Sequence, residues 1–211
     1  MDRTPAWIGA RDAPALLLVT GFIVVAVLVR GGGPLPFDLS VTRAIQDVLG
    51  TGLGPLLGAA EAVLAFVPLM IAIAIALFRR AWRSAGVIAA AMVAAYVAIG
   101  LIELALGRPR PDPSLVSVFE RPSTSSGFPS VSVSGSVVFA LLVTALARHA
   151  RSGLANLVLG LTLGIALLTS LTVVYLGVHW ASDVLGAWLI GGAFGLALAA
   201  RLPAAATPRD P

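Results

Sequence analysis

Cysteine and lysine are both absent from this chain of 211 residues, and charge of either sign is scarce. Without cysteine the chain can form no disulfide, no thiol nucleophile and no cysteine-ligated metal site. All 14 of its basic side chains are arginines. Charged residues make up only 11% of the sequence, whereas a soluble domain carries about 25%. This scarcity excludes an ordinary soluble globular domain.

Apolar residues take the place of the missing charge. The chain is 58% hydrophobic, with a mean hydropathy of +0.98, which indicates an integral membrane protein built as one compact bundle. A net charge of +4 raises the question of nucleic-acid binding. The arginines, however, are scattered between apolar runs, and membrane topology explains this pattern better than a nucleic-acid surface does. We therefore expect the bilayer, and no nucleic acid, as a partner.

Six apolar runs predict transmembrane helices, at residues 14–29, 55–78, 84–106, 130–147, 154–174 and 179–200. A cleaved signal peptide is the alternative for the first run, but Asp2 and Asp12 cancel the charge before it, and no small-residue cleavage site precedes Arg30. Residues 37–49 alternate charged and apolar side chains, which predicts a short amphipathic helix on the membrane surface. The expected fold is all-α, with six transmembrane helices in one bundle and this surface helix after the first span.

An even number of spans places both termini on the same side of the membrane. Nine arginines would lie on that side and five on the other, so the positive-inside rule predicts cytoplasmic termini. We expect residues 1–13 and 202–211 to be cytoplasmic tails that flank a membrane domain at 14–201. The polar segments after the third and fifth spans would then face outward, in what we expect to be a bacterial plasma membrane.

The most reactive residue types lie in the polar segment that opens the last span. His179 and Asp183 are four residues apart and would share one face of a helix. An aspartate so placed can hold the imidazole tautomer and leave the other nitrogen free to attack or to bind a metal. A polar pair without function at the membrane interface is the alternative. Glu103 would complete a metal-binding set by residue type, but no metal-binding spacing supports it, so we expect no metal.

Three short motifs together resemble the type-2 phosphatidic acid phosphatase superfamily. They are Gly107-Arg108-Pro109-Arg110-Pro111, Phe128-Pro129-Ser130 and the stretch from Tyr175 to Asp183. The family signature has Lys, six residues and Arg-Pro, then Pro-Ser-Gly-His, then Ser-Arg, five residues, His, three residues and Asp. The order, the spacing and the six-span layout fit over roughly residues 37–200. The family includes lipid-phosphate phosphatases, undecaprenyl-diphosphate phosphatases and vanadium haloperoxidases.

The resemblance implies roles for the residues that match the signature. His179 would be the nucleophile that takes the phosphoryl group, and Asp183 would orient it. Arg110 and Ser130 would hold the phosphate oxygens of an isoprenoid or glycerolipid phosphate, and we expect no cofactor. Arg108 does not match the signature, but it is a further candidate for phosphate binding because it could supply a second cation from the loop. Without the other motifs, Arg108 and Arg110, each followed by a proline, would be only a helix stop with cations for lipid headgroups.

Five signature positions depart from the family pattern. Glu103 stands in place of Lys, Ser132 in place of His and Val173 in place of Arg, while Val131 replaces Gly and Thr172 replaces Ser. Phosphoryl transfer depends mainly on positioning and on charge stabilisation. Losing a general acid typically costs about 10²–10⁴-fold in rate, and losing a stabilising donor about 10²–10³-fold. The residue pattern therefore predicts a pseudoenzyme.

Two functional hypotheses follow. The preferred one is a non-catalytic or severely impaired relative that engages a lipid phosphate, or serves a protein partner in the membrane, at the extracytoplasmic face. Glu103 would repel a phosphate and could pair with Arg110. The alternative is an active lipid-phosphate phosphatase of the phosphatidate or undecaprenyl-diphosphate type. It would work through a phosphohistidine at His179, with Arg108 or Arg121 as the second cation.

Overall fold

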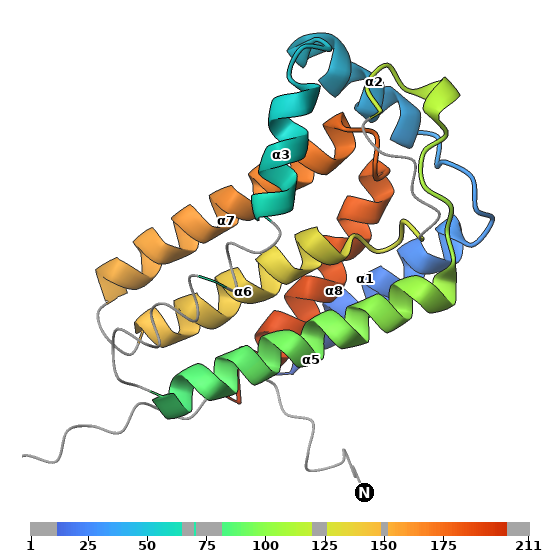
Figure 1. Ribbon diagram of the computed structural model, residues 1–211. Coiled ribbons are helices and arrows are strands. Elements are labelled where there is room, and N and C mark those ends of the chain that lie inside the picture. Colours follow the sequence, from blue (N-terminus) through green and yellow to red (C-terminus); the bar gives the residue numbers. More distant parts are fainter. Residues whose placement is uncertain (1–11, 65–69, 71–81, 120–125, 149–151, 202–211) are drawn as a thin grey trace, which may run out of the picture.

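The computed structural model describes residues 12–64, 70, 82–119, 126–148 and 152–201 (Figure 1). Every regular element within these ranges is helical, which confirms the all-α fold class. The elements in chain order are α1 (Ala13–Val29), α2 (Asp38–Leu49), α3 (Gly54–Leu64), α5 (Trp82–Leu106), the short 3-10 helix η1 (Pro113–Leu115), α6 (Val131–Arg148), α7 (Ser152–Tyr175) and α8 (Ala181–Ala199).

Three of these helices are long and apolar enough to cross a membrane, with spans at Ile88–Leu106 in α5, Ala155–Tyr175 in α7 and Ala181–Ala199 in α8. Helix α1 and the stretch Val131–Ala145 of α6 are apolar but shorter. Most of the predicted span at 55–78 lies outside the described residues, which include its first part as α3. A membrane-spanning bundle is thus confirmed, and its total of six spans stays a prediction.

Helices α6 and α8 lie at the centre of the bundle (Figure 1). Helix α6 packs against α5, α7 and α8, and α8 also packs against α1. The two central helices meet closely at Gly191, where an added Cβ would lie 2.7 Å from the backbone oxygen of Ser134. Small residues allow such an approach between membrane helices, since backbones can then touch. Nearer their N-terminal ends, the N–H of Ser130 just before α6 donates to the carbonyl of Asp183 in the first turn of α8 at 3.4 Å.

Helix α2 lies across one end of the bundle (Figure 1). Its three buried residues are Asp38, Thr42 and Gln46, which recur every fourth residue and form one stripe. The outer side is more apolar, and the side chain of Val48 is 83% exposed. The structure therefore has a helix where the alternating pattern at 37–49 predicted one, but its polar stripe packs against the protein.

Gln46 connects α2 to two segments that are distant in sequence. Its Nε2 donates hydrogen bonds to the carbonyl oxygens of Val118 at 3.0 Å and Tyr175 at 2.7 Å. Its Oε1 accepts the N–H of Ser117 at 2.8 Å. Because a buried amide needs its partners, these bonds favour one placement of the loop after α5 and of the end of α7. Both segments thereby meet at the α2 end of the bundle, where the polar motifs lie.

Candidate functional site

His179 lies in the tight turn between α7 and α8. Gly177 begins this turn with a φ of 63°, and an added Cβ there would lie 2.6 Å from the backbone oxygen of Val118. Only glycine tolerates both the left-handed backbone and this contact. The N–H groups of Val178 and His179 then donate to the carbonyl of Val173, each at 3.2 Å. The turn therefore fixes the backbone from which the His179 ring projects.

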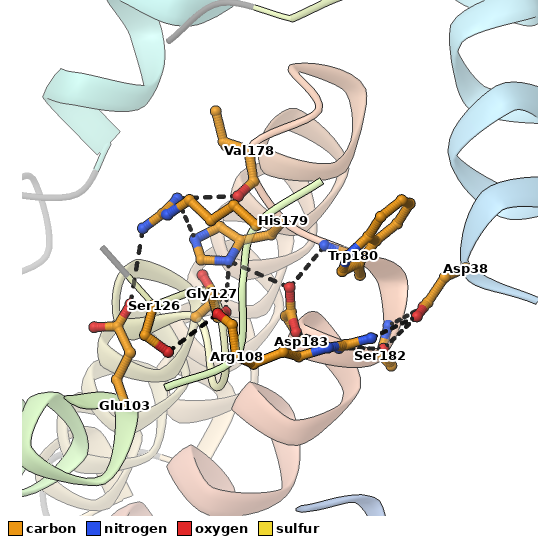
Figure 2. Close-up of polar contacts among 12 residues, drawn as sticks. Asp38, Glu103, Arg108, Ser126, Gly127, Val178, His179, Trp180, Ser182 and Asp183 are labelled. Atoms are coloured by element: carbon orange, nitrogen blue, oxygen red, sulfur yellow. Dashed lines mark hydrogen bonds and ion pairs between the residues drawn. The ribbon is translucent and has the colours of Figure 1, made fainter. Parts of the chain in front are cut away.

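The two ring nitrogens of His179 have different partners (Figure 2). Nδ1 lies 2.8 Å from the carbonyl oxygen of Gly127, and Nε2 lies 3.3 Å from Nη1 of Arg110. A carbonyl can only accept a hydrogen bond and a guanidinium can only donate one. The neutral ring with its proton on Nδ1 satisfies both contacts, and the lone pair of Nε2 then faces Arg110.

Asp183 lies behind this imidazole and also closes the first turn of α8. Its Oδ2 accepts the N–H of Trp180 at 2.8 Å and lies 3.6 Å from His179 Nδ1. Its Oδ1 accepts a short hydrogen bond from Nη1 of Arg108. The carboxylate is fully buried. The ring is therefore oriented through the Gly127 carbonyl at hydrogen-bond distance, with Asp183 at ion-pair distance behind it.

Arg108 is buried at the centre of the charged residues, with 2% of its surface exposed. Its Nη1 also donates to Ser182 Oγ at 2.7 Å. Its Nη2 donates to the carbonyl of Gly33 and to Asp38 Oδ2, both at 3.0 Å. Within the described part of the chain, its Nε has no hydrogen-bond partner. The Nη donors of Arg108 thus point at the protein itself, and phosphate binding by Arg108 stays a prediction.

Asp38 is the residue that the sequence analysis did not identify as part of the site. It is fully buried, and Figure 2 places it beside Ser182 and Arg108. Its carboxylate accepts the N–H and the Oγ–H of Ser182, both at 2.7 Å, and the N–H of Leu35 at 2.8 Å. An acidic group at a helix N-terminus stabilises that end. The spacing of Asp38, Thr42 and Gln46 was the available signal, because it marks one polar face.

Arg110 and Glu103 form the outer part of the same network. Arg110 Nη2 lies 3.7 Å from Glu103 Oε1, and its Nη1 donates to the carbonyl of Val178 at 3.0 Å. Their side chains are 19% and 17% exposed. Gly127 lets these groups come together, since an added Cβ would lie 3.2 Å from Asp183 Oδ2 and 3.4 Å from Arg110 Cγ. Glu103, which the resemblance would have as Lys, is thus the ion-pair partner of Arg110.

The charges of this network do not favour a phosphate dianion. Two arginines, Arg108 and Arg110, meet three carboxylates, those of Asp38, Glu103 and Asp183. With His179 neutral, these described residues carry a net charge of −1. A negative site raises the free energy of a bound anion, most of all where little water screens it. Arg121, the other candidate cation, lies outside the described residues.

The remaining signature residues are buried or paired with one another. Ser130 is buried just before α6, with its Oγ 3.4 Å from Ser132 Oγ. Val131 begins α6. Val173 is fully buried in an apolar cluster, and the buried Oγ1 of Thr172 has no partner among the described residues. The structure thus brings Glu103, Arg110, His179 and Asp183 together, whereas the side chain of Val173 lies in the core.

Metal binding was the other chemistry open to Glu103, His179 and Asp183. Within the described ranges, no group of three histidine or acidic side chains is arranged to hold a metal ion. Asp183 instead accepts hydrogen bonds from Arg108 and Trp180, and Arg110 contacts both Glu103 and His179.

Comparison with known proteins identifies the family and a similar fold. The family model for the PAP2 superfamily matches residues 84–205, more than half of the chain. Among solved structures, the chain is similar to the first transmembrane PAP2 type phosphatidylglycerolphosphate phosphatase from Bacillus subtilis, with a TM-score of 0.67 and 20% sequence identity. The similarity covers 87% of this chain and 93% of that chain. No protein with a curated description matches. The chain is therefore an integral membrane protein that belongs to the PAP2 superfamily.

Proposed function

We propose that this protein binds the phosphate of an isoprenoid or glycerolipid and hydrolyses it very slowly or not at all. The observation that carries the proposal is the position of Arg110. Its guanidinium lies 3.3 Å from His179 Nε2 and 3.7 Å from Glu103 Oε1. The nitrogen that would attack phosphorus is thus hydrogen-bonded to a cation. The cation that would hold the phosphate is paired with a carboxylate.

The other signature positions support the loss of catalysis. Ser132 offers a hydroxyl where the family has an imidazole, and a serine hydroxyl is not a usual general acid for a leaving group. Val173 offers no charge, and its side chain lies in the core. The chain therefore lacks two groups that would stabilise the transition state but keeps a histidine and an arginine that can meet a phosphate.

Binding would proceed by exchange on Arg110. Phosphate oxygens would replace the Glu103 carboxylate, because charge-assisted hydrogen bonds from a guanidinium suit both groups. The Glu103 carboxylate would then lie beside the bound ligand. Arg108 would stay in place, since four hydrogen bonds from its Nη atoms hold it among Gly33, Asp38, Ser182 and Asp183.

The membrane topology belongs to the same proposal. Six spans would put both termini on one side of the membrane. Most of the arginines would lie on that side, which would place residues 1–13 and 202–211 in the cytoplasm. The end that carries α2 and His179 would face outward, so the ligand would come from the outer leaflet.

An active phosphatase is the second candidate, and one observation favours it. The Nδ1 proton of His179 is held by the Gly127 carbonyl at 2.8 Å, which leaves Nε2 as the nitrogen with a lone pair. A phosphohistidine would form there if the incoming phosphate displaced Arg110 from Nε2. The two candidates therefore differ in turnover and share the ligand.

Phosphate release and lipid binding separate them. Purified protein and His179→Ala would be assayed on phosphatidic acid, phosphatidylglycerol phosphate and undecaprenyl diphosphate. Native mass spectrometry would measure binding for the wild type, Arg110→Ala and the matched variant Arg30→Ala, whose arginine is exposed and lies outside the network. We expect the wild type to bind lipid without releasing phosphate. Arg110→Ala should weaken this binding, whereas Arg30→Ala should not. Release that disappears in His179→Ala would overturn the loss of catalysis.

A further inference from the structure

We propose that the Glu103–Arg110 pair selects a zwitterionic headgroup, in which a phosphate and a primary amine are joined by a short linker. This rests on the proposed function and names the class of ligand. Arg110 would hold the phosphate and Glu103 would hold the ammonium group. Phosphatidylethanolamine is the simplest lipid of this class.

The first support is the difference in exposure within the network. Asp38, Arg108 and Asp183 each have at most 2% of their surface exposed. Arg110 and Glu103 are 19% and 17% exposed, and their closest charged atoms are 3.7 Å apart. A ligand at this end of the bundle would therefore meet one positive and one negative side chain of the network. Their separation exceeds the 2.7–2.9 Å of a strong charge-assisted hydrogen bond, so the pair can open for a ligand that replaces both partners.

The second support is the depth of the pair in the membrane. Glu103 lies in the last turn of α5, within the span Ile88–Leu106. Three residues advance a helix by about 4.5 Å, so the carboxylate lies close to the end of the span, at the level of lipid headgroups. Leu106, which shares the Glu103 face of the helix, is 39% exposed, and the adjacent Leu104 is 75% exposed. A lipid whose chain packed beside these two leucines would present its headgroup to Glu103.

The third support is charge. An anionic headgroup that took Arg110 would leave the Glu103 carboxylate without its partner and next to a second anion. Breaking a partly buried ion pair in this way is unfavourable. A headgroup with both charges replaces each half of the pair, so the site keeps its charge balance. The change from Lys to Glu at position 103 is thus a change of ligand preference as well as a loss of a cation.

Binding of defined lipids tests this preference. Detergent-solubilised protein would be titrated with phosphatidylethanolamine, phosphatidylglycerol and phosphatidic acid of the same acyl chains, followed by native mass spectrometry. We expect the wild type to bind phosphatidylethanolamine about tenfold more tightly than phosphatidylglycerol, as for one ion pair worth about 1.4 kcal/mol. Glu103→Gln should abolish this ratio, and Glu103→Asp should keep part of it. Asp47→Asn removes an exposed carboxylate on α2 and should leave the ratio unchanged.

Soluble competitors distinguish a lipid from a free headgroup. If phosphoethanolamine competes at concentrations similar to those of the lipid, the site recognises the same chemistry in a soluble headgroup. If phosphoethanolamine does not compete, the ligand is a lipid. Equal competition by inorganic phosphate would overturn the inference, because the amine would then contribute nothing.

Two further results are decisive. Tighter binding of phosphatidic acid or phosphatidylglycerol than of phosphatidylethanolamine would overturn the zwitterion preference and leave lipid-phosphate binding standing. Failure of every lipid to bind would overturn the proposed function together with this inference.

Discussion

Arg108 and Arg110 stand two residues apart in one motif, yet they occupy different environments. Arg108 is 2% exposed and lies between the carboxylates of Asp38 and Asp183. Arg110 is 19% exposed and shares a looser pair with Glu103. The inner arginine connects the segment after α5 to α2 and α8. The outer one has the looser ion pair and the more exposed side chain, so we propose that it meets the ligand.

Restoring the family residues at positions 103 and 132 should have the largest effect on phosphatase activity. The variant Glu103→Lys with Ser132→His would free Arg110 and supply a cation and a general acid. We expect phosphate release from phosphatidic acid to rise by at least about 10²-fold, the usual contribution of one such group. Release that stays at the wild-type level in a folded double variant would show that the surroundings of Arg110 and His179 do not fit phosphoryl transfer.

The third family residue must be tested separately. Val173→Arg places a charge in a fully buried apolar cluster, and an unpaired buried charge is strongly destabilising. We expect this single variant to lower the thermal unfolding midpoint in detergent while Glu103→Lys does not. A triple variant as stable as the double variant would mean that position 173 can turn toward the network.

Removal of the inner arginine comes next. Arg108→Leu would leave two buried carboxylates without their cation, and breaking such a pair costs about 3–5 kcal/mol of folding free energy. Chemical denaturation in detergent measures this loss. Stability equal to that of the wild type would contradict the structural role of Arg108.

A smaller effect is expected at Gly127, which lies between the buried Asp183 and the more exposed Arg110. Gly127→Ala would place a Cβ 3.2 Å from Asp183 Oδ2 and 3.4 Å from Arg110 Cγ. Overpacking of this kind costs about 1–3 kcal/mol. We also expect the His179 imidazole resonances to shift in NMR spectra, because its Nδ1 partner is the Gly127 carbonyl. Unchanged resonances would place the adjustment elsewhere.

The smallest effect on stability should come from the outer arginine. Arg110→Ala breaks a partly exposed ion pair, and such pairs contribute at most about 1 kcal/mol. The same denaturation experiment should therefore separate this variant clearly from Arg108→Leu. A loss as large as that of Arg108→Leu would remove the distinction between the two arginines.

Sequence patterns predicted the helices well but not the partners of the charged residues. The apolar runs at 14–29, 84–106 and 154–174 correspond to α1, α5 and α7, because burial in lipid imposes long apolar stretches. The motif containing both arginines does not indicate which one points inward. That choice depends on Asp38, which lies 70 residues earlier in the chain. Contacts at such separation leave no local periodic signal.

The partner of Glu103, in contrast, could be anticipated from the sequence. The place of Glu103 seven residues before Arg110 made a pair with that arginine conceivable from sequence, and the structure contains the pair at 3.7 Å. The roles assigned to His179, Asp183, Ser130 and Arg110 stay predictions.

The contacts of Asp38 have a consequence for biogenesis. Asp38 and Arg108 belong to helices and loops that are synthesised early, whereas Ser182 and Asp183 enter with α8, the last helix. Until α8 is inserted, the buried network lacks two of its members, Ser182 and Asp183. Assembly of the bundle is therefore completed from its C-terminal side, and a nascent chain halted before α8 would expose a polar seam that membrane quality control can recognise.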